Sequence, residues 1–157
     1  MVTFFESEPP TTMSEIQDIE KLVGLTFPTA YKEHLLKYNG GRCKPNVFYF
    51  NERGKMTNSN VNCFFAVADG AISLKDYIEI FKVDDKRMPT HIIPIADDSV
   101  GNMICISCGQ GDLGHIYFWD HEREVNYNLS DDNDYSNLYF VARDLQSFLD
   151  SLLDVEF

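Results

Sequence analysis

The spacing of hydrophobic residues along the chain changes from a helical period to the short, dense runs that are typical of strands. The first helical stripe repeats every three to four positions and consists of Ile16, Ile19, Leu22 and Val23. Two overlapping capping boxes precede the stripe, Thr12 with Glu15 and Ser14 with Gln17, and Gly24 follows it as a left-handed stop. This pattern predicts a helix from about Thr12 to Gly24.

Three further segments have helical spacing. Pro28 opens the first of them, and Asn39-Gly40-Gly41 ends it because these residues tolerate a left-handed backbone. Its expected buried side consists of Tyr31, Leu35, Leu36 and Tyr38. Ser73 caps the next helix, whose hydrophobic positions are Leu74, Tyr77, Ile78 and Phe81. A last amphipathic helix follows Arg143 and carries Leu145, Phe148, Leu149 and Leu152.

Short hydrophobic runs bounded by glycine, asparagine and aspartate predict strands between these helices. The runs cover residues 47–50, 63–67, 91–96, 103–107 and 115–120, and a further strand is expected near residues 125–129. The connections at 97–102 and 108–114 are short, which favours antiparallel hairpins over crossover helices. The order of elements predicts an α+β fold in which a central, mostly antiparallel sheet is flanked by about four helices.

The composition indicates one well-packed domain and excludes several classes of protein. Of the 157 residues, 44% are hydrophobic and 13% are aromatic, which excludes disordered and collagen-like chains. Residues 1–157 contain no repeat or linker, so we expect a single domain in which residues 1–11 form a short polar arm. The longest unbroken apolar run, residues 63–68, is far shorter than the ~20 residues of a membrane span. The N-terminal residues lack the pattern of a secretory signal, and we therefore expect a cytoplasmic protein.

The four cysteines indicate buried, reduced thiols rather than a metal or redox site. Cys105 and Cys108 have the spacing of a zinc knuckle, but neither Cys43 nor Cys63 belongs to a second pair that would complete a tetrahedral site. In addition, Cys105 lies in the strand expected at 103–107, where residues three apart point to opposite faces of a sheet. No metal site is predicted.

Three other motifs resemble functional sites without meeting their structural requirements. Gly109-Gln-Gly111-Asp-Leu-Gly114 matches a dinucleotide-binding motif, but a strand-like segment follows it instead of a helix, so a hairpin turn is predicted. Residues 131–142 resemble a calcium loop, with Ser136 in place of the required glycine and Ala142 in place of the bidentate carboxylate. His121-Glu122 lacks the second histidine of a zinc-protease helix. We predict no cofactor and no catalytic residue, and a dispersed His/Asp enzyme site is left as an alternative.

The charge of the chain is strongly negative and concentrated near the C-terminus. There are 13 lysines and arginines against 25 aspartates and glutamates, which gives a formal net charge of −12. In residues 120–157 the lysine and arginine positions are Arg123 and Arg143, and the acidic positions are Asp120, Glu122, Glu124, Asp131, Asp132, Asp134, Asp144, Asp150, Asp154 and Glu156. Such a charge distribution argues against direct binding to nucleic acid or to anionic membranes. It suits either a solvated face or a docking surface for a basic protein.

Three segments in this order resemble the SUKH superfamily, which is named for a fungal regulator of cell-wall synthesis and its bacterial relatives. The first is residues 25–41, where a proline-led helix with an aromatic residue and paired leucines ends in Asn-Gly-Gly. The second is the strand–turn–strand at residues 93–106. The third combines the strand at 114–121, which contains Trp119, with a closing helix at 144–153. The resemblance extends from about residue 15 to residue 153.

The resemblance implies a compact α+β domain without catalytic residues. Bacterial members commonly act as immunity proteins that neutralise a cognate polymorphic toxin, often a nuclease, whereas the fungal module serves as an interaction hub. We therefore expect a non-enzymatic immunity protein with a cognate, basic toxin protein as its partner, and a regulatory or scaffold module is the alternative. The candidate partner-binding residues are Trp119, Glu122, Asp131, Asp132, Asp134 and Tyr135, with Asp97 and Asp98 as a second patch. The alternatives are a core position for Trp119 and a solvated loop for residues 131–134.

Overall fold

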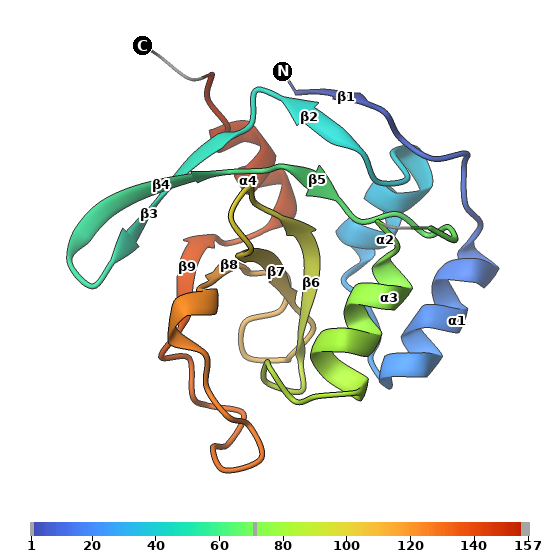
Figure 1. Cartoon of the computed structure of the whole chain (residues 1–157). Helices are drawn as coiled ribbons and strands as arrows, with labels where there is room; N and C mark the ends of the chain where they lie inside the picture. The colour runs from blue at the N-terminus through green and yellow to red at the C-terminus, as the bar shows by residue number, and fades with distance from the viewer. Residues whose placement is uncertain (1, 71, 155–157) are drawn as a thin grey trace.

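The computed structural model describes residues 2–70 and 72–154, and it combines helices with antiparallel sheets (Figure 1). The four α-helices in these residues are α1 (Met13–Val23), α2 (Thr29–Lys37), α3 (Leu74–Ile78) and α4 (Leu145–Ser151). A π-helical turn (Glu79–Val83) extends α3, and a 3-10 turn (His121–Arg123) follows the strand β8 (Ile116–Trp119). None of the described helices has the length and apolar character needed to cross a bilayer. The α+β class and the number of helices agree with the sequence prediction, which is confirmed.

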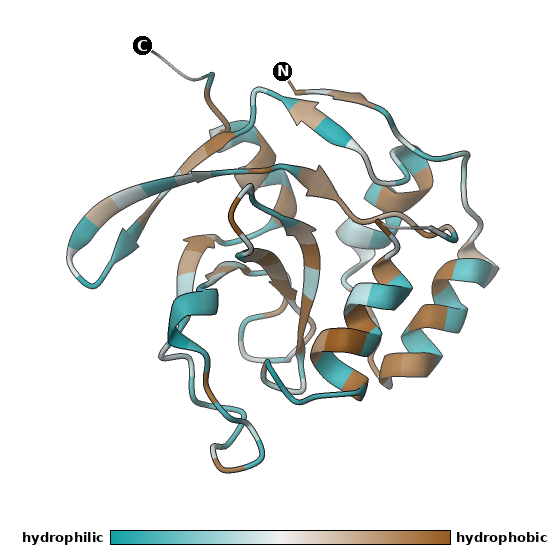
Figure 2. Cartoon of the chain, viewed as in Figure 1, coloured by the Kyte–Doolittle hydropathy of each residue, from teal (hydrophilic) through white to brown (hydrophobic). Residues whose placement is uncertain are grey.

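The main sheet has five strands, and each strand pairs antiparallel with the next one along the chain. Its strands are β5 (Cys63–Phe64), β6 (Ile92–Asp97), β7 (Met103–Ser107), β8 and β9 (Leu138–Ala142). Short connections favour this arrangement, because neighbouring antiparallel strands need only a tight turn between them. The strands expected at 91–96, 103–107 and 115–120 are confirmed. Figure 2 shows that β6 and β7 are largely hydrophobic, while the connection from β8 to β9 is mostly hydrophilic.

The last strand of this sheet differs from the sequence prediction. Residues 125–129 form no strand, because the Asn126 side chain accepts the amide hydrogen of Asn128 at 3.0 Å and holds the chain in a turn. Leu138–Ala142 takes the place beside β8 instead. Leu138 and Tyr139 are buried there. The segment 138–142 is more hydrophobic than residues 125–129, and it therefore forms the strand next to β8.

The N-terminal residues take part in the fold more closely than the predicted arm suggests. Thr3–Phe5 forms β1, which pairs antiparallel with β2 (Arg42–Lys44). Phe4 stacks on Tyr38 at the end of α2, with ring centroids 4.3 Å apart. Aromatic contact and backbone pairing together explain why this part of the predicted arm is a strand.

A further pair of strands forms a long hairpin that reaches beyond the main sheet (Figure 1). β3 (Val47–Glu52) pairs along its whole length with β4 (Lys55–Asn60), a polar segment that lies outside the strands expected from the sequence. The true turn is at residues 53 and 54, whose φ angles of 54° and 90° are those of a tight hairpin turn. Phe50 is buried and stacks on Phe118 of β8 at 4.5 Å, so the inner face of the hairpin packs on the main sheet.

Side chains and glycine account for the helix boundaries. Thr12 accepts the amide hydrogen of Glu15 at 3.2 Å at the start of α1, and Gly24 ends this helix with a φ of 73°. Ser73 and Asp144 cap α3 and α4 by accepting amide hydrogens at 3.4 and 2.7 Å. The predicted boundaries at Thr12, Gly24 and Ser73 are confirmed.

The helix α2 has a slightly different buried face from the predicted one. Leu35 is buried as expected, but Leu36 is 37% exposed and His34 is buried instead. Just after the helix, the side chain of Asn39 accepts the amide hydrogen of Val67 at 2.7 Å and donates to the carbonyl of Val67 at 3.0 Å. The Asn-Gly-Gly end of α2 therefore joins this helix to the segment that leads from β5 to α3.

Candidate functional site

A dense group of carboxylates lies in the connection from β8 to β9, residues 120–137, which we call the acidic loop. Its acidic residues are Asp120, Glu122, Glu124, Asp131, Asp132 and Asp134. The loop begins with the 3-10 turn, which Asp120 caps by accepting the amide hydrogen of Glu122 at 2.9 Å. Figure 1 shows the rest of the loop as a long orange segment that extends away from the sheet. Most of the predicted partner-binding residues belong to it.

The first half of the acidic loop is tethered to the segment after α3. Arg87 donates two hydrogen bonds to the carboxylate of Glu124, at 2.8 and 2.9 Å. Its guanidinium lies over the ring of Phe81, 4.2 Å from the centroid. The carbonyl of Arg87 also accepts the indole N–H of Trp119 at 3.1 Å. One arginine thus connects the loop to the hydrophobic core.

Two carboxylates of the acidic loop are held by hydrogen bonds that favour their ionised form. Asp132 accepts the amide hydrogen of Thr90 at 2.9 Å, and this bond lowers the pKa of Asp132. Asp134 accepts hydrogen bonds from Ser136, which lower the pKa of Asp134. The backbone carbonyl of Asp134 in turn accepts the hydroxyl hydrogen of Tyr127 at 2.6 Å. Both side chains therefore carry negative charge at neutral pH.

A third tether connects the acidic loop to the turn between β7 and β8. The hydroxyl of Tyr135 donates to Asp112 at 2.8 Å, and Asp112 also accepts hydrogen bonds from Tyr117 at 2.7 Å and Ser107 at 2.5 Å. Burial raises the pKa of Asp112, but these three hydrogen bonds outweigh burial and keep the pKa below its usual value. His91 Nε2 contacts the Tyr135 hydroxyl, and it is the donor there because that hydroxyl already donates to Asp112.

The contact among His91, Tyr135 and Asp112 is suited to holding the loop rather than to proton transfer. Burial and the hydrogen bond to Asp112 raise the pKa of Tyr135, so its hydroxyl stays protonated. Both oxygens of Asp112 already accept hydrogen bonds. The turn that contains Asp112 is the glycine motif at 109–114, and it connects β7 to β8 as a hairpin. The predicted turn is confirmed.

Between the tethers, the acidic loop presents side chains to solvent. Glu122 and Asp131 are exposed, and Leu129 is 87% exposed. Sequence reasoning missed Leu129 because it placed this residue in a strand at 125–129. The available signal is that Leu129 is the last hydrophobic residue before an unbroken polar run, residues 130–134. The exposed part of the loop thus combines carboxylates with one apolar side chain.

Trp119 is a core residue and not a surface contact, which corrects its place among the predicted binding residues. Its side chain is 0% exposed, and its ring meets Phe81 edge-on with centroids 5.2 Å apart. Its sequence neighbours in β8 are also buried, so the whole strand lies between packed layers. A side chain without exposed surface cannot act as an interface anchor.

The second predicted patch divides between two places in the structure. Asp97 accepts hydrogen bonds from the Asn62 side chain and the Cys63 amide, both at 3.1 Å, so it faces β5, and burial raises its pKa. Asp98 is 3% exposed and accepts hydrogen bonds from Ser59 at 2.9 Å and the Asn102 side chain at 2.8 Å. Asp98 lines a groove beside the β3–β4 hairpin, whereas Asp97 does not.

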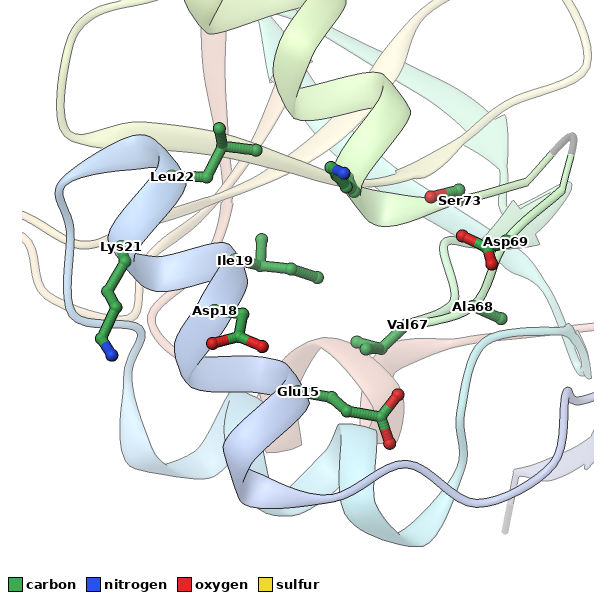
Figure 3. A pocket seen from close by; sticks show the side chains of 10 residues that line it. Glu15, Asp18, Ile19, Lys21, Leu22, Val67, Ala68, Asp69 and Ser73 are labelled. Carbon is green, nitrogen blue, oxygen red and sulfur yellow. The ribbon is translucent and has the colours of Figure 1, made fainter.

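A separate hollow of about 650 Å³ lies between α1 and residues 67–75 (Figure 3). Ile19 and Val67 give it an apolar part, and Glu15 lies at its side. Figure 3 shows that Lys21 points away from it. None of the residues predicted for partner binding lines this hollow.

The thiols and carboxylates do not form a metal centre in the part of the chain that the structure describes, where no group of three or more potential ligands occurs. All four cysteines are free, and burial raises the pKa of Cys108 to about 12. Burial also raises the pKa of Cys105. Because the thiolate is the reactive form, both thiols are poorly suited to redox or metal chemistry.

Comparison with known proteins places the chain in a family. Residues 13–149 match the family model SUKH_6, described as SMI1-KNR4 cell-wall. The chain is 28% identical over 159 residues to the SPbeta prophage-derived uncharacterized protein YokK of Bacillus subtilis (strain 168). This alignment covers 91% of this chain and 75% of YokK. It is 50% identical over 36 residues to the uncharacterized protein YnaB of the same organism, covering 23% of this chain and 25% of YnaB. Since the family model spans α1 to α4, the resemblance seen in the sequence is confirmed, and the chain belongs to the SUKH (SMI1-KNR4) family.

Proposed function

We propose that this protein is a non-enzymatic immunity protein that binds a cognate toxin protein and neutralises it by covering part of its surface. Family membership supports this function, since SUKH proteins are known as immunity proteins and are generally non-enzymatic. The proposed contact surface is the exposed part of the acidic loop. Glu122, Asp131 and Leu129 contact the toxin there, and the ionised Asp132 and Asp134 add negative charge.

The observation that carries the proposal is that the acidic loop is held in place before any partner binds. Arg87, Thr90 and Asp112 each fix a different part of it through hydrogen bonds of 2.8 to 2.9 Å. A preformed surface loses little conformational entropy on binding. Clustered negative charge also accelerates the encounter with a positively charged partner.

The partner that fits this surface is a basic protein, such as a nuclease toxin. A nuclease carries positive charge where it holds phosphate, and an acidic inhibitor can occupy that groove in place of nucleic acid. The net charge of −12 disfavours direct contact with nucleic acid or with an anionic membrane. We propose the cytoplasm as the compartment, where the protein meets a nuclease that has entered the cell.

Co-expression with the toxin tests the proposal. The expected toxin is the C-terminal domain of a large secreted protein encoded beside the gene for this chain. Cells that express the toxin domain are expected to survive when this chain is present, and the two proteins are expected to co-purify. Unchanged toxicity would contradict the immunity function.

Paired variants test the role of the acidic loop in the same assay. Asp131→Asn with Asp132→Asn is expected to reduce survival and co-purification, since it removes two charges from the loop. Glu8→Gln with Glu33→Gln removes two exposed charges elsewhere and is expected to keep full protection. Full protection by the loop variant would place the contact surface outside the loop.

A regulatory or scaffold role is the second candidate, because the family description refers to the cell wall. The partner is then a cellular protein and not a toxin. In the co-expression assay such a module leaves toxicity unchanged. It still binds its partner through the acidic loop, and the loop variant weakens that binding.

A further inference from the structure

A groove of about 430 Å³ lies between the β3–β4 hairpin and the start of the acidic loop. The hairpin lines one side of it, and the 3-10 turn, with His121 and Glu122, lines another. The turn from β6 to β7 also contributes side chains. The groove therefore opens next to the surface that we propose for toxin binding.

Part of the groove is apolar. Phe50 and Phe118 stack on each other there and are 3% and 6% exposed, so they present only a small part of their rings to the groove. Val100 also lines it and is 68% exposed. These side chains offer a surface for the methylene groups of a long side chain.

The groove is also lined by four acidic residues, Glu52, Asp98, Asp120 and Glu122. Asp98 accepts hydrogen bonds from a serine hydroxyl, an asparagine side chain and two backbone amides, all of which are neutral. Asp120 has one cation nearby, Arg123, whose Nε lies 3.9 Å from Asp120 Oδ2. This contact is long and the Arg123 side chain is half exposed, so solvent screens the pair. Among the described residues, no lysine or arginine lines the groove. Its negative charge is therefore only weakly compensated, and the low-dielectric walls focus the field.

A chain of hydrogen bonds fixes the relative positions of the groove's parts. Ser59 of β4 donates to Asp98 at 2.9 Å, and the Asn102 side chain donates to the same carboxylate at 2.8 Å. Asn102 Oδ1 accepts the backbone amide hydrogen of His121 at 3.0 Å and lies 2.5 Å from His121 Nδ1. Hairpin, turn and acidic loop thus hold one geometry, which reduces the entropic cost of receiving a ligand.

We infer that this groove receives an arginine side chain from the protein partner, an inference that rests on and extends the proposed function. The planar guanidinium donates several hydrogen bonds in a fixed fork and is less strongly hydrated than an ammonium group, so it suits a groove that contains several carboxylates and some apolar surface. The chain uses the same chemistry internally. Arg87 lies over the Phe81 ring and donates two hydrogen bonds to Glu124.

A peptide titration tests the groove without any toxin. The probe is a short glycine–serine peptide with one arginine, and matched peptides carry lysine or citrulline at the same position. Amide chemical shifts of the full chain are recorded at low ionic strength. The arginine peptide is expected to shift residues 57–59, 100–102 and 121–122, the lysine peptide to bind more weakly, and the uncharged citrulline peptide to cause no saturable shift.

Two variants with equal loss of charge separate the groove from the part of the acidic loop around residues 131 and 132, which does not line it. Glu52→Gln with Glu122→Gln is expected to weaken binding of the arginine peptide about two- to 25-fold, since each surface carboxylate contributes a change of about 1.4- to fivefold. Asp131→Asn with Asp132→Asn is expected to leave this binding nearly unchanged. Equal weakening by both variants, equal binding of citrulline, or shifts confined to other residues would overturn the inference. The immunity proposal fails separately, when co-expression gives no rescue.

Discussion

Tyr135 donates a 2.8 Å hydrogen bond to Asp112 and so joins the loop after β8 to the turn before it. The same carboxylate accepts hydrogen bonds from Tyr117 and Ser107, which places it at the centre of a group of hydroxyl donors. Since these bonds lower the pKa of Asp112 despite burial, the ionised form is the one the fold stabilises. The position of the acidic loop therefore depends on a residue outside it.

Asp112→Asn is expected to destabilise the protein by about 2 kcal/mol, because hydrogen bonds to a charged acceptor are lost and an amide nitrogen cannot accept them. Urea unfolding measures the change in the free energy of unfolding. Glu33→Gln is the control, because it removes a charge from an exposed position on α2 and is expected to change stability by less than about 0.5 kcal/mol. Equal stability of the two variants would show that Asp112 does not hold the loop.

Trp119→Ala is expected to cost about 3–5 kcal/mol of folding free energy, because a fully buried ring is removed from the core. Trp119→Phe keeps an aromatic ring and loses the hydrogen bond to the Arg87 carbonyl, so its cost is expected to be smaller. Denaturant unfolding measures both changes. The folded Trp119→Phe variant is expected to bind the partner with the same affinity as the wild type. A large loss of affinity at unchanged stability would show that Trp119 contacts the partner.

His34 is expected to make the protein sensitive to mild acid. Burial, and secondarily Lys37, lowers the pKa of His34 from 6.5 to about 4. The unfolded chain therefore takes up a proton below about pH 6.5, whereas the folded chain does not until about pH 4, so stability falls as the pH decreases through this window. The slope from one such histidine is about 1.4 kcal/mol per pH unit. His34→Phe keeps a ring beside Phe4 and Phe64 and is expected to flatten this part of the stability profile.

Unfolding measured between pH 4 and 7 for wild type and His34→Phe tests this prediction. Titration of the carboxylates affects both proteins, so the difference between the two profiles isolates the histidine. Parallel profiles would show that the folded and unfolded states bind a proton at His34 equally.

Asp131→Asn with Asp132→Asn is expected to slow association with the proposed toxin partner and to weaken the salt dependence of the association rate, because surface charge acts mainly on the rate of encounter. The free energy of unfolding is expected to change little. Asparagine still has an oxygen that can accept the Thr90 amide hydrogen at the second position. Stopped-flow association at low and physiological salt measures the effect. A wild-type rate that does not respond to salt would contradict an electrostatic role for the loop.

Local signals made most of the helices predictable from the sequence. The Thr12 cap, the Gly24 stop and the Ser73 cap act through neighbouring residues, so one sequence is sufficient to recognise them. β4 was not predictable in the same way, because Lys55–Asn60 has no hydrophobic alternation and becomes a strand by pairing with β3. Residues 125–129 alternate like a strand, but the asparagine side chains at 126 and 128 favour turns.

The charge of the acidic loop is readable from the sequence, but its tethers are not. Arg87 is 37 residues from Glu124, and Thr90 is 42 residues from Asp132. Asp112 lies in the glycine motif at 109–114, which resembles a nucleotide-binding loop. Nothing in that motif indicates that Asp112 accepts hydrogen bonds from Tyr117, Tyr135 and Ser107. Such pairs arise only when the sheet brings distant turns together, so no spacing rule within one sequence reveals them.

The acidic loop contains residues that are hydrogen-bonded to other parts of the chain and residues that are free in solvent, and we expect substitutions to be tolerated differently at the two kinds of position. Glu124, Asp132 and Tyr135 are bound to other parts of the chain, whereas Leu129 and Asp131 point into solvent. If the acidic loop is the toxin-contact surface that we propose, a change of toxin can be met by substitutions at the free side chains, while the tethering hydrogen bonds stay in place. Divergence among close homologues should therefore concentrate at these intervening positions, while the tethering residues change together with their distant partners.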